Sequence, residues 1–88
     1  MKANFVNYTS VWGNPEDGYT VDDSATIYEN IELPNLEDAT LIKYLKQRNF
    51  LTAKANRRNI RVEDFYPCLE IVEAATDYPL GRFEVMEE

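Results

Sequence analysis

One segment of this chain, residues 35–50, carries apolar residues at helical spacing, and the segments around it alternate as β-strands do. Leu41, Ile42 and Leu45, together with Tyr44, form the apolar stripe of the predicted helix. A helix of about three turns is marginal in water by itself. We therefore expect it to pack against a sheet built from the rest of the chain.

Both ends of the predicted helix carry the residues that helix ends favour. Asn35 or Asp38 can cap the start, and the acids Glu37 and Asp38 lie near the positive end of the helix dipole. Asn49 is a suitable left-handed terminator, after which Phe50 turns back onto the core. The helix should therefore end close to Asn49.

The first third of the chain predicts strands around one turn. Residues 5–12 are rich in aromatic and β-branched side chains, as strands are. Residues 13–18, Gly-Asn-Pro-Glu-Asp-Gly, are dense in turn-forming residues. We expect a short extended piece at 19–21, an interruption at 22–24, and a second strand at 25–33.

The predicted strand 25–33 has one buried face. Ile27, Ile31 and Leu33 share one parity, whereas Glu32 has the other, so one side should face the core and the other water.

The last third of the chain predicts a hairpin. Residues 52–59 indicate a loop or a ragged helical extension, and residues 60–63 a brief strand. Strands over 66–74 and 81–87 should form the hairpin around a turn at 77–81. Apolar residues of both parities, such as Ile71 and Val72, predict that the first of these strands is partly covered on both faces.

These elements together predict the α+β class. We expect residues 1–88 to form a single domain, in which a small antiparallel sheet of four to five strands has one α-helix packed on one face. At this size the chain buries only about 60–65% of its extended surface, so self-association is one way to add stability.

The residue types that are missing exclude several functions. The chain has no histidine and one cysteine, Cys68, which removes Cys/His zinc sites, serine–histidine catalysis and an internal disulfide. The acids around residues 16–23 lack the spacing of a calcium loop. We therefore predict no catalytic residues, no metal and no cofactor, and a protein that is not an enzyme.

Nothing in the sequence predicts a membrane or secreted protein. No apolar run approaches the ~18 residues that cross a bilayer, and the first residues have no apolar signal segment. We expect a cytoplasmic protein.

The aromatic and acidic turn near the start of the chain is the candidate protein-binding site. Trp12 and Tyr19 flank the turn, and tryptophan and tyrosine dominate protein-binding hot spots. Core packing is the competing explanation for both rings. In the leading hypothesis Trp12 and Tyr19 are the anchors, and the charge preference is set by Glu16, Asp17, Asp22 and Asp23. The identity of the partner stays open.

Charge is distributed unevenly and suggests two alternatives. Residues 1–40, 41–61 and 62–88 carry net charges of −7, +7 and −7. The basic segment could be neutralised by acidic strands, or it could bind nucleic acid. The acidic segments would also suit a nucleic-acid mimic that inhibits a DNA-binding enzyme. The basic candidates are Lys43, Lys46, Arg48, Lys54, Arg57, Arg58 and Arg61.

One sequence pattern resembles a known group of proteins. Residues 11–23 read Val-Trp-Gly-Asn-Pro-Glu-Asp-Gly-Tyr-Thr-Val-Asp-Asp, and a Leu-Pro strand end at Leu33-Pro34 leads into the helix. This resembles small uncharacterised proteins of bacteriophages and mobile elements, over about half of the chain. The resemblance implies a phage or mobile-element accessory protein and carries no activity from which functional residues could be transferred.

Overall fold

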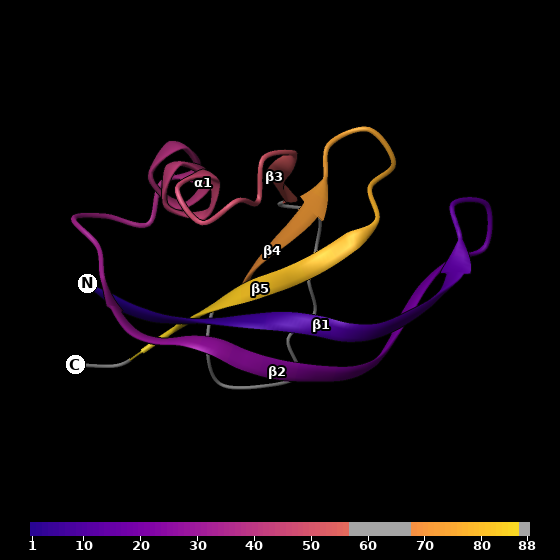
Figure 1. Cartoon of the computed structure of the whole chain (residues 1–88), viewed down its shortest axis with the longest axis horizontal. Coiled ribbons are helices and arrows are strands. Elements are labelled where there is room, and N and C mark those ends of the chain that lie inside the picture. Colours follow the sequence, from indigo (N-terminus) through magenta and orange to yellow (C-terminus); the bar gives the residue numbers. More distant parts are fainter. Residues whose placement is uncertain (57–67, 87–88) are drawn as a thin grey trace.

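The strands form one antiparallel sheet and a short helix accompanies it. The computed structural model describes residues 1–56 and 68–86. In chain order the elements are β1 (Lys2–Asn14), β2 (Gly18–Glu32), α1 (Asp38–Lys46), β3 (Ala53–Asn56), β4 (Cys68–Glu73) and β5 (Pro79–Val85). The five strands lie in the order β2-β1-β5-β4-β3 (Figure 1). The predicted α+β class with an antiparallel sheet is confirmed.

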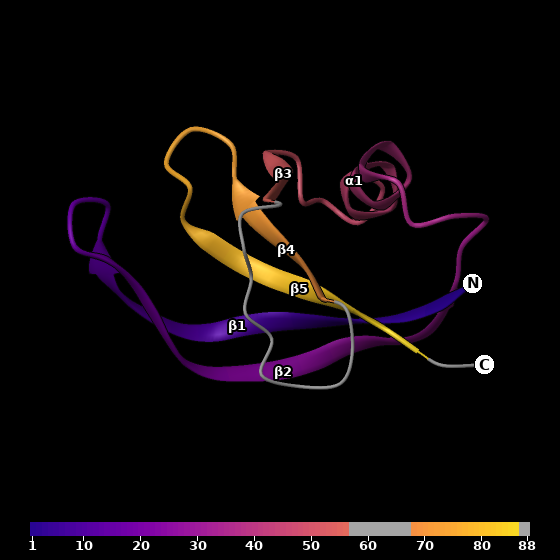
Figure 2. The ribbon, with the colours of Figure 1, turned by 180° about the vertical axis from the view of Figure 1, so that it is seen from behind.

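The first hairpin extends well beyond the strands beside it. β5 pairs with β1 only from Ala3 to Asn7, whereas the pairing of β1 with β2 continues to Asn14 and Gly18. Figure 1 shows the outer part of this hairpin leaving the sheet and curving toward the β4–β5 loop. We call residues 8–24 the arm, and the remaining elements the body. In both views α1 lies beside β3 and far from the tip of the arm (Figures 1 and 2).

The turn at the tip of the arm forms where the sequence predicts it. The Asn14 Oδ1 atom accepts a hydrogen bond of 2.7 Å from the Asp17 backbone N–H. Gly13 and Gly18 both have positive φ, at 114° and 90°. A Cβ on Gly13 would lie 2.4 Å from the Gly18 carbonyl oxygen. Glycine is therefore required at Gly13 both by the backbone conformation and by the close approach of the two strands.

The predicted break between two strands at residues 22–24 is wrong. β2 runs through this segment, because a register shift lets Asp22 stand as an extra residue between the pairs Val11–Val21 and Ser10–Asp23. A β-bulge of this kind bends a strand without ending it.

The predicted buried face of β2 is wrong at Ile27. Ile31 and Leu33 are buried, but the Ile27 side chain is 42% exposed. The register shifts between Ala3 and Val6 of β1, and Asn30 adopts a positive φ of 53°, so the simple alternation of sides is lost. Tyr28, instead of Ile27, packs against the core.

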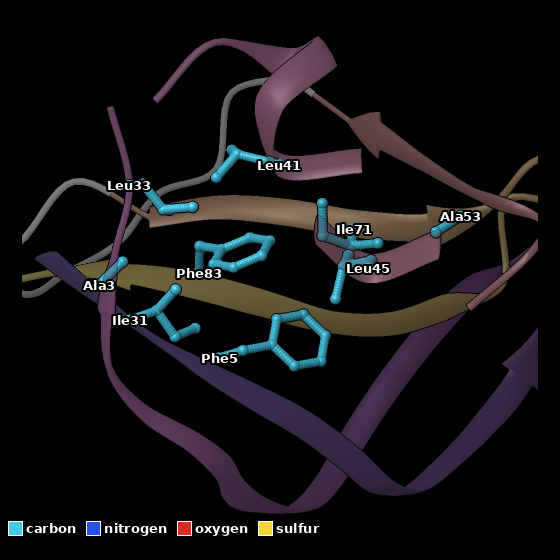
Figure 3. Close-up of a cluster of buried hydrophobic side chains, with 9 residues drawn as sticks. All are labelled: Ala3, Phe5, Ile31, Leu33, Leu41, Leu45, Ala53, Ile71 and Phe83. Atoms are coloured by element: carbon cyan, nitrogen blue, oxygen red, sulfur yellow. The ribbon is translucent and has the colours of Figure 1, made fainter. Parts of the chain in front are cut away.

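The core is one cluster shared by the helix and the strands of the body. Phe5 and Phe83 are paired residues of β1 and β5, and their ring centroids are 4.9 Å apart. Figure 3 shows Leu41 and Leu45 of α1 in the same cluster as these rings. The predicted apolar stripe of the helix is therefore confirmed in its two leucines. Ile42 and Tyr44 are partly buried beside them.

The ends of α1 differ in how well the sequence predicted them. The Asn35 Oδ1 atom accepts a hydrogen bond of 3.0 Å from the Glu37 N–H, but Glu37 occupies the N-cap position and Asp38 begins the helix instead of capping it. The predicted left-handed terminator is confirmed, since Asn49 has a φ of 70°. The Phe50 N–H then donates to the Leu45 carbonyl oxygen over 3.0 Å, which closes the last turn.

The segment after the helix was predicted incorrectly. The loop or helical extension expected at 52–59 is wrong for residues 53–56, which form the edge strand β3 and pair with β4. The rest of that segment, and the strand predicted at 60–63, lie outside the described residues.

The predicted second hairpin is confirmed with one correction. β4 and β5 are antiparallel neighbours, and both Ile71 and Val72 of β4 are buried, as their two parities predicted. Gly81, however, lies inside β5 and not in the turn. A Cβ there would stand 2.3 Å from the Val6 carbonyl oxygen and 2.7 Å from the Phe5 ring, so this glycine allows β5 to approach β1.

Candidate functional site

The arm exposes the one tryptophan of the chain. The side chain of Trp12 is 61% exposed, whereas Phe5, on the same strand, is completely buried. The difference arises because β5 lies beside β1 at Phe5 and pairs no further than Asn7. Core packing, the competing explanation for Trp12, is therefore wrong for this residue.

The two predicted anchors project from opposite faces of the arm. Trp12 pairs with Thr20, and the next pair joins Gly13 to Tyr19. Paired residues share a face of a sheet, and successive residues alternate between faces. Trp12 and Tyr19 therefore do not form one continuous surface. We call the two sides the Trp12 face and the Tyr19 face.

Tyr19 contacts a residue that the sequence reasoning missed. The ring centroids of Tyr19 and Tyr78 are 5.3 Å apart, and the rings meet edge to face at an interplanar angle of 71°. Tyr78 belongs to the segment between β4 and β5, and its side chain is 40% exposed. In the sequence, Tyr78 is only part of the predicted turn at 77–81. An aromatic residue within a predicted turn was the available signal, although it did not indicate Tyr19 as the neighbour.

The four predicted acidic residues of the site lie along the arm and are all exposed. Asp17 is held by Asn14, whose Nδ2 donates to the Asp17 Oδ2 atom over 3.2 Å. Asp23 pairs with Ser10, two residues before Trp12, and its Oδ1 atom accepts a hydrogen bond of 2.8 Å from the Ser24 N–H. Residues 1–40 contain one base, Lys2, at the opposite end of β1. The full acidic set is Glu16, Asp17, Asp22 and Asp23.

The candidate nucleic-acid site is only partly described. Lys54 forms an ion pair with Asp77, with a distance of 2.8 Å between Nζ and Oδ1. Lys43 and Lys46 are exposed on α1 and line a shallow, open hollow together with Ile42. The three remaining bases of the segment, Arg57, Arg58 and Arg61, lie outside the described residues.

Arg48, the fourth described base, covers two tyrosine rings. Its guanidinium carbon lies 3.6 Å from the centroid of Tyr44 and 5.5 Å from that of Tyr28, and its Nη1 donates to the Tyr44 carbonyl oxygen over 3.2 Å. Burial raises the pKa of the Tyr44 phenol, and the positive charge of Arg48 partly offsets this rise. Arg48 is thus committed to a contact within the molecule.

The described residues contain neither a cluster of metal-ligand side chains nor a membrane-spanning helix. Residues 1–56 and 68–86 contain no group of three or more acidic or cysteine side chains arranged to hold a metal ion. Within the same ranges no helix is long and apolar enough to cross a membrane. The side chain of Cys68 lies outside the described part of the structure.

No protein-family model, no curated protein and no solved structure matches this chain.

Proposed function

We propose that this chain is a small, non-enzymatic binding protein that holds a protein partner through its arm. The observation that carries the proposal is the exposure of Trp12 on a hairpin that extends beyond the body. A large aromatic surface left in water contributes nothing to folding, whereas buried in an interface it is among the strongest anchors. The partner buries the Trp12 face.

The charge of the arm selects the kind of partner. Asp23 shares the Trp12 face, through its pairing with Ser10, and the acids of the tip stand beside it. No base lies between Lys2 and Lys43 in the sequence. Such a surface favours a cationic protein surface and increases its rate of association at low salt.

The body serves as the support for the arm. In this proposal α1 covers one face of the sheet. Two contacts support this placement: Leu41 and Leu45 share a buried cluster with Phe5, and the ring centroids of Tyr44 and Phe83 are 6.2 Å apart. A packed base of this kind holds the root of the arm in place while its tip remains free to bind.

A pull-down from a host lysate, with and without nuclease treatment, tests the proposal. Trp12→Ala should lose the captured protein. Leu51→Ala is the matched control, because Leu51 is a comparably exposed apolar side chain, at 68%, located beyond the end of α1. Thermal unfolding of both variants should match that of the original protein. Equal capture by the two variants would contradict the proposal, and so would capture that nuclease abolishes.

Nucleic-acid binding is the second candidate, favoured by the seven bases and absence of acids in residues 41–61. A gel-shift titration at several salt concentrations tests it, since phosphate contacts make affinity fall steeply with salt. Lack of binding at low salt would remove this candidate. A phage or mobile-element origin and a cytoplasmic location are likewise proposals, based on the sequence resemblance and on composition.

A further inference from the structure

The molecule contains two edge-to-face tyrosine pairs of similar geometry. In the body, Tyr28 and Tyr44 have centroids 5.9 Å apart at an interplanar angle of 81°. Between arm and body, Tyr19 and Tyr78 are 5.3 Å apart at 71°. Arg48 covers the first pair with its guanidinium group. Among the described residues no cation lies over the second pair.

We propose that the Tyr19–Tyr78 pair receives an arginine side chain from a basic segment of the partner protein. This inference rests on the proposed function and names the chemistry that the Tyr19 face recognises. A guanidinium group stacks on aromatic rings through its planar charge, and the Tyr28–Tyr44 pair shows this chain holding one in that way. The partner therefore contacts both faces of the arm. It buries Trp12 on one face and places its arginine on the Tyr19 face.

The charges around the pair favour a cation. The acidic turn precedes Tyr19, with Asp17 two residues before it, and Asp22 follows three residues after it. Asp77 is the residue before Tyr78 and forms an ion pair with Lys54. The ammonium group of Lys54 is therefore bound to a carboxylate and not to the tyrosine rings. The sequence neighbours of the two tyrosines thus include more acids than bases, and the rings are partly exposed.

The two described arginines of the chain are already engaged. Arg48 lies on Tyr44, and Arg82 pairs with Glu84, with 3.1 Å between Nε and Oε2, while its guanidinium lies 5.7 Å from the Tyr8 ring. The whole chain has a net charge of −7, which opposes association of copies. The proposed source of the arginine is accordingly a second protein and not another copy of this chain.

A titration followed by NMR tests the proposal with hexa-arginine and hexalysine peptides as probes. The ring signals of Tyr19 and Tyr78 should shift with hexa-arginine. This peptide should bind about two- to fivefold more tightly than hexalysine, because the planar, weakly hydrated guanidinium group stacks on an aromatic ring better than an ammonium group does. The rings of Tyr28 and Tyr44 serve as the internal reference, because Arg48 already covers them. Equal binding of the two peptides, or shifts confined to the carboxylates, would overturn the proposal.

Two variants at Tyr78 separate the ring from its hydroxyl group. Tyr78→Leu should remove the preference for arginine, whereas Tyr78→Phe should keep it, with circular dichroism confirming that both fold. If Tyr78→Leu does not fold, the comparison of the two peptides on the original protein still decides the matter. Sedimentation without peptide adds a check, since a dimer that Tyr78→Leu abolishes would overturn the proposal in favour of a second copy.

The same pull-down distinguishes this inference from the proposed function. If Trp12→Ala loses the partner and Tyr78→Leu keeps it at full strength, the proposed function stands and the arginine site is wrong. If both variants retain the partner, the proposed function fails as well. Weakened capture by Tyr78→Leu together with loss by Trp12→Ala supports both.

Discussion

The body and the arm use one strand, β1, in opposite ways. In the body, residues Ala3 to Asn7 of β1 have strands on both sides, β2 and β5. In the arm, residues 8–14 of the same strand pair with β2 alone among the described strands. Phe5 is fully buried in the first part and Trp12 is mostly exposed in the second.

The difference teaches that a neighbouring strand, more than the apolar character of a residue, decides what is buried. Phe5 and Trp12 belong to the same predicted strand and both have large aromatic rings. A two-stranded ribbon offers no third element to cover its faces, so its apolar side chains stay in contact with water or with a partner. The arm is the part of the sheet in which β1 and β2 have no further paired strand among the described residues.

The largest expected effect is at the root of β1. Phe5→Ala should lower the free energy of unfolding by about 3–5 kcal/mol, because it opens a cavity beside Phe83, Phe50 and Tyr28. Chemical denaturation monitored by circular dichroism measures this. A loss below about 1 kcal/mol would contradict the difference between body and arm, since the body would then tolerate removal of an aromatic ring as the arm does.

The glycines sharpen the comparison at the level of the backbone. Gly81→Ala should cost roughly 3 kcal/mol, because the new Cβ would meet a backbone oxygen of Val6 that cannot move aside easily. Gly18→Ala is the control in the arm, where no atom lies within 4 Å and only the positive φ is unfavourable. It should cost roughly 1 kcal/mol. Denaturation midpoints that rank the two in reverse order would contradict this account of β5.

The covered tyrosine pair offers a smaller test. Arg48→Gln should lower the free energy of unfolding by about 0.5–1 kcal/mol through the lost cation–π contact. It should also raise the pKa of Tyr44 further, since the guanidinium stabilises the phenolate. Because that pKa is raised by folding, its contribution to stability is present below about pH 10 and is lost as pH rises through the folded value. An ultraviolet titration of tyrosine ionisation checks the direction of the shift; a fall in the pKa would refute it.

The smallest effect is expected at Trp12. Trp12→Ala should change the free energy of unfolding by about 0.5 kcal/mol or less, since the side chain is mostly in water. The fluorescence of this single tryptophan in the original protein should be that of a solvated indole and readily quenched by acrylamide. A blue-shifted, protected emission from the isolated protein would mean that the arm folds back onto another surface.

Local chemistry made several elements predictable. Asn49, just after the end of α1, adopts a positive φ because a short polar side chain tolerates it, and the turn at 13–18 forms because glycine does. The hairpin of β4 and β5 could be predicted for a similar reason, from turn-forming residues between two segments with the composition of strands. For the candidate site, the exposure of Trp12 and the acids on the arm agree with the sequence hypothesis of an accessible turn.

Other features depended on contacts between distant segments. Ile27 and Ile31 look equivalent in the sequence, but register shifts against β1 expose the first and bury the second. Residues 53–56 have no strand pattern of their own. They form β3 because their backbone pairs with the edge of β4. Tyr78 joins the candidate site only because the arm curves toward the β4–β5 loop (Figure 1).

By itself, the sequence determined the uneven distribution of charge, and it determined the helix, the turn at 13–18 and the hairpin of β4 and β5, since these elements follow from the conformational preferences of neighbouring residues. Only the tertiary structure decided which strands lie side by side. It thereby decided that Phe5 is core, that Trp12 is surface, and that Tyr19 meets Tyr78. The physical reason is that burial is a property of the space between elements, which no short stretch of residues specifies alone.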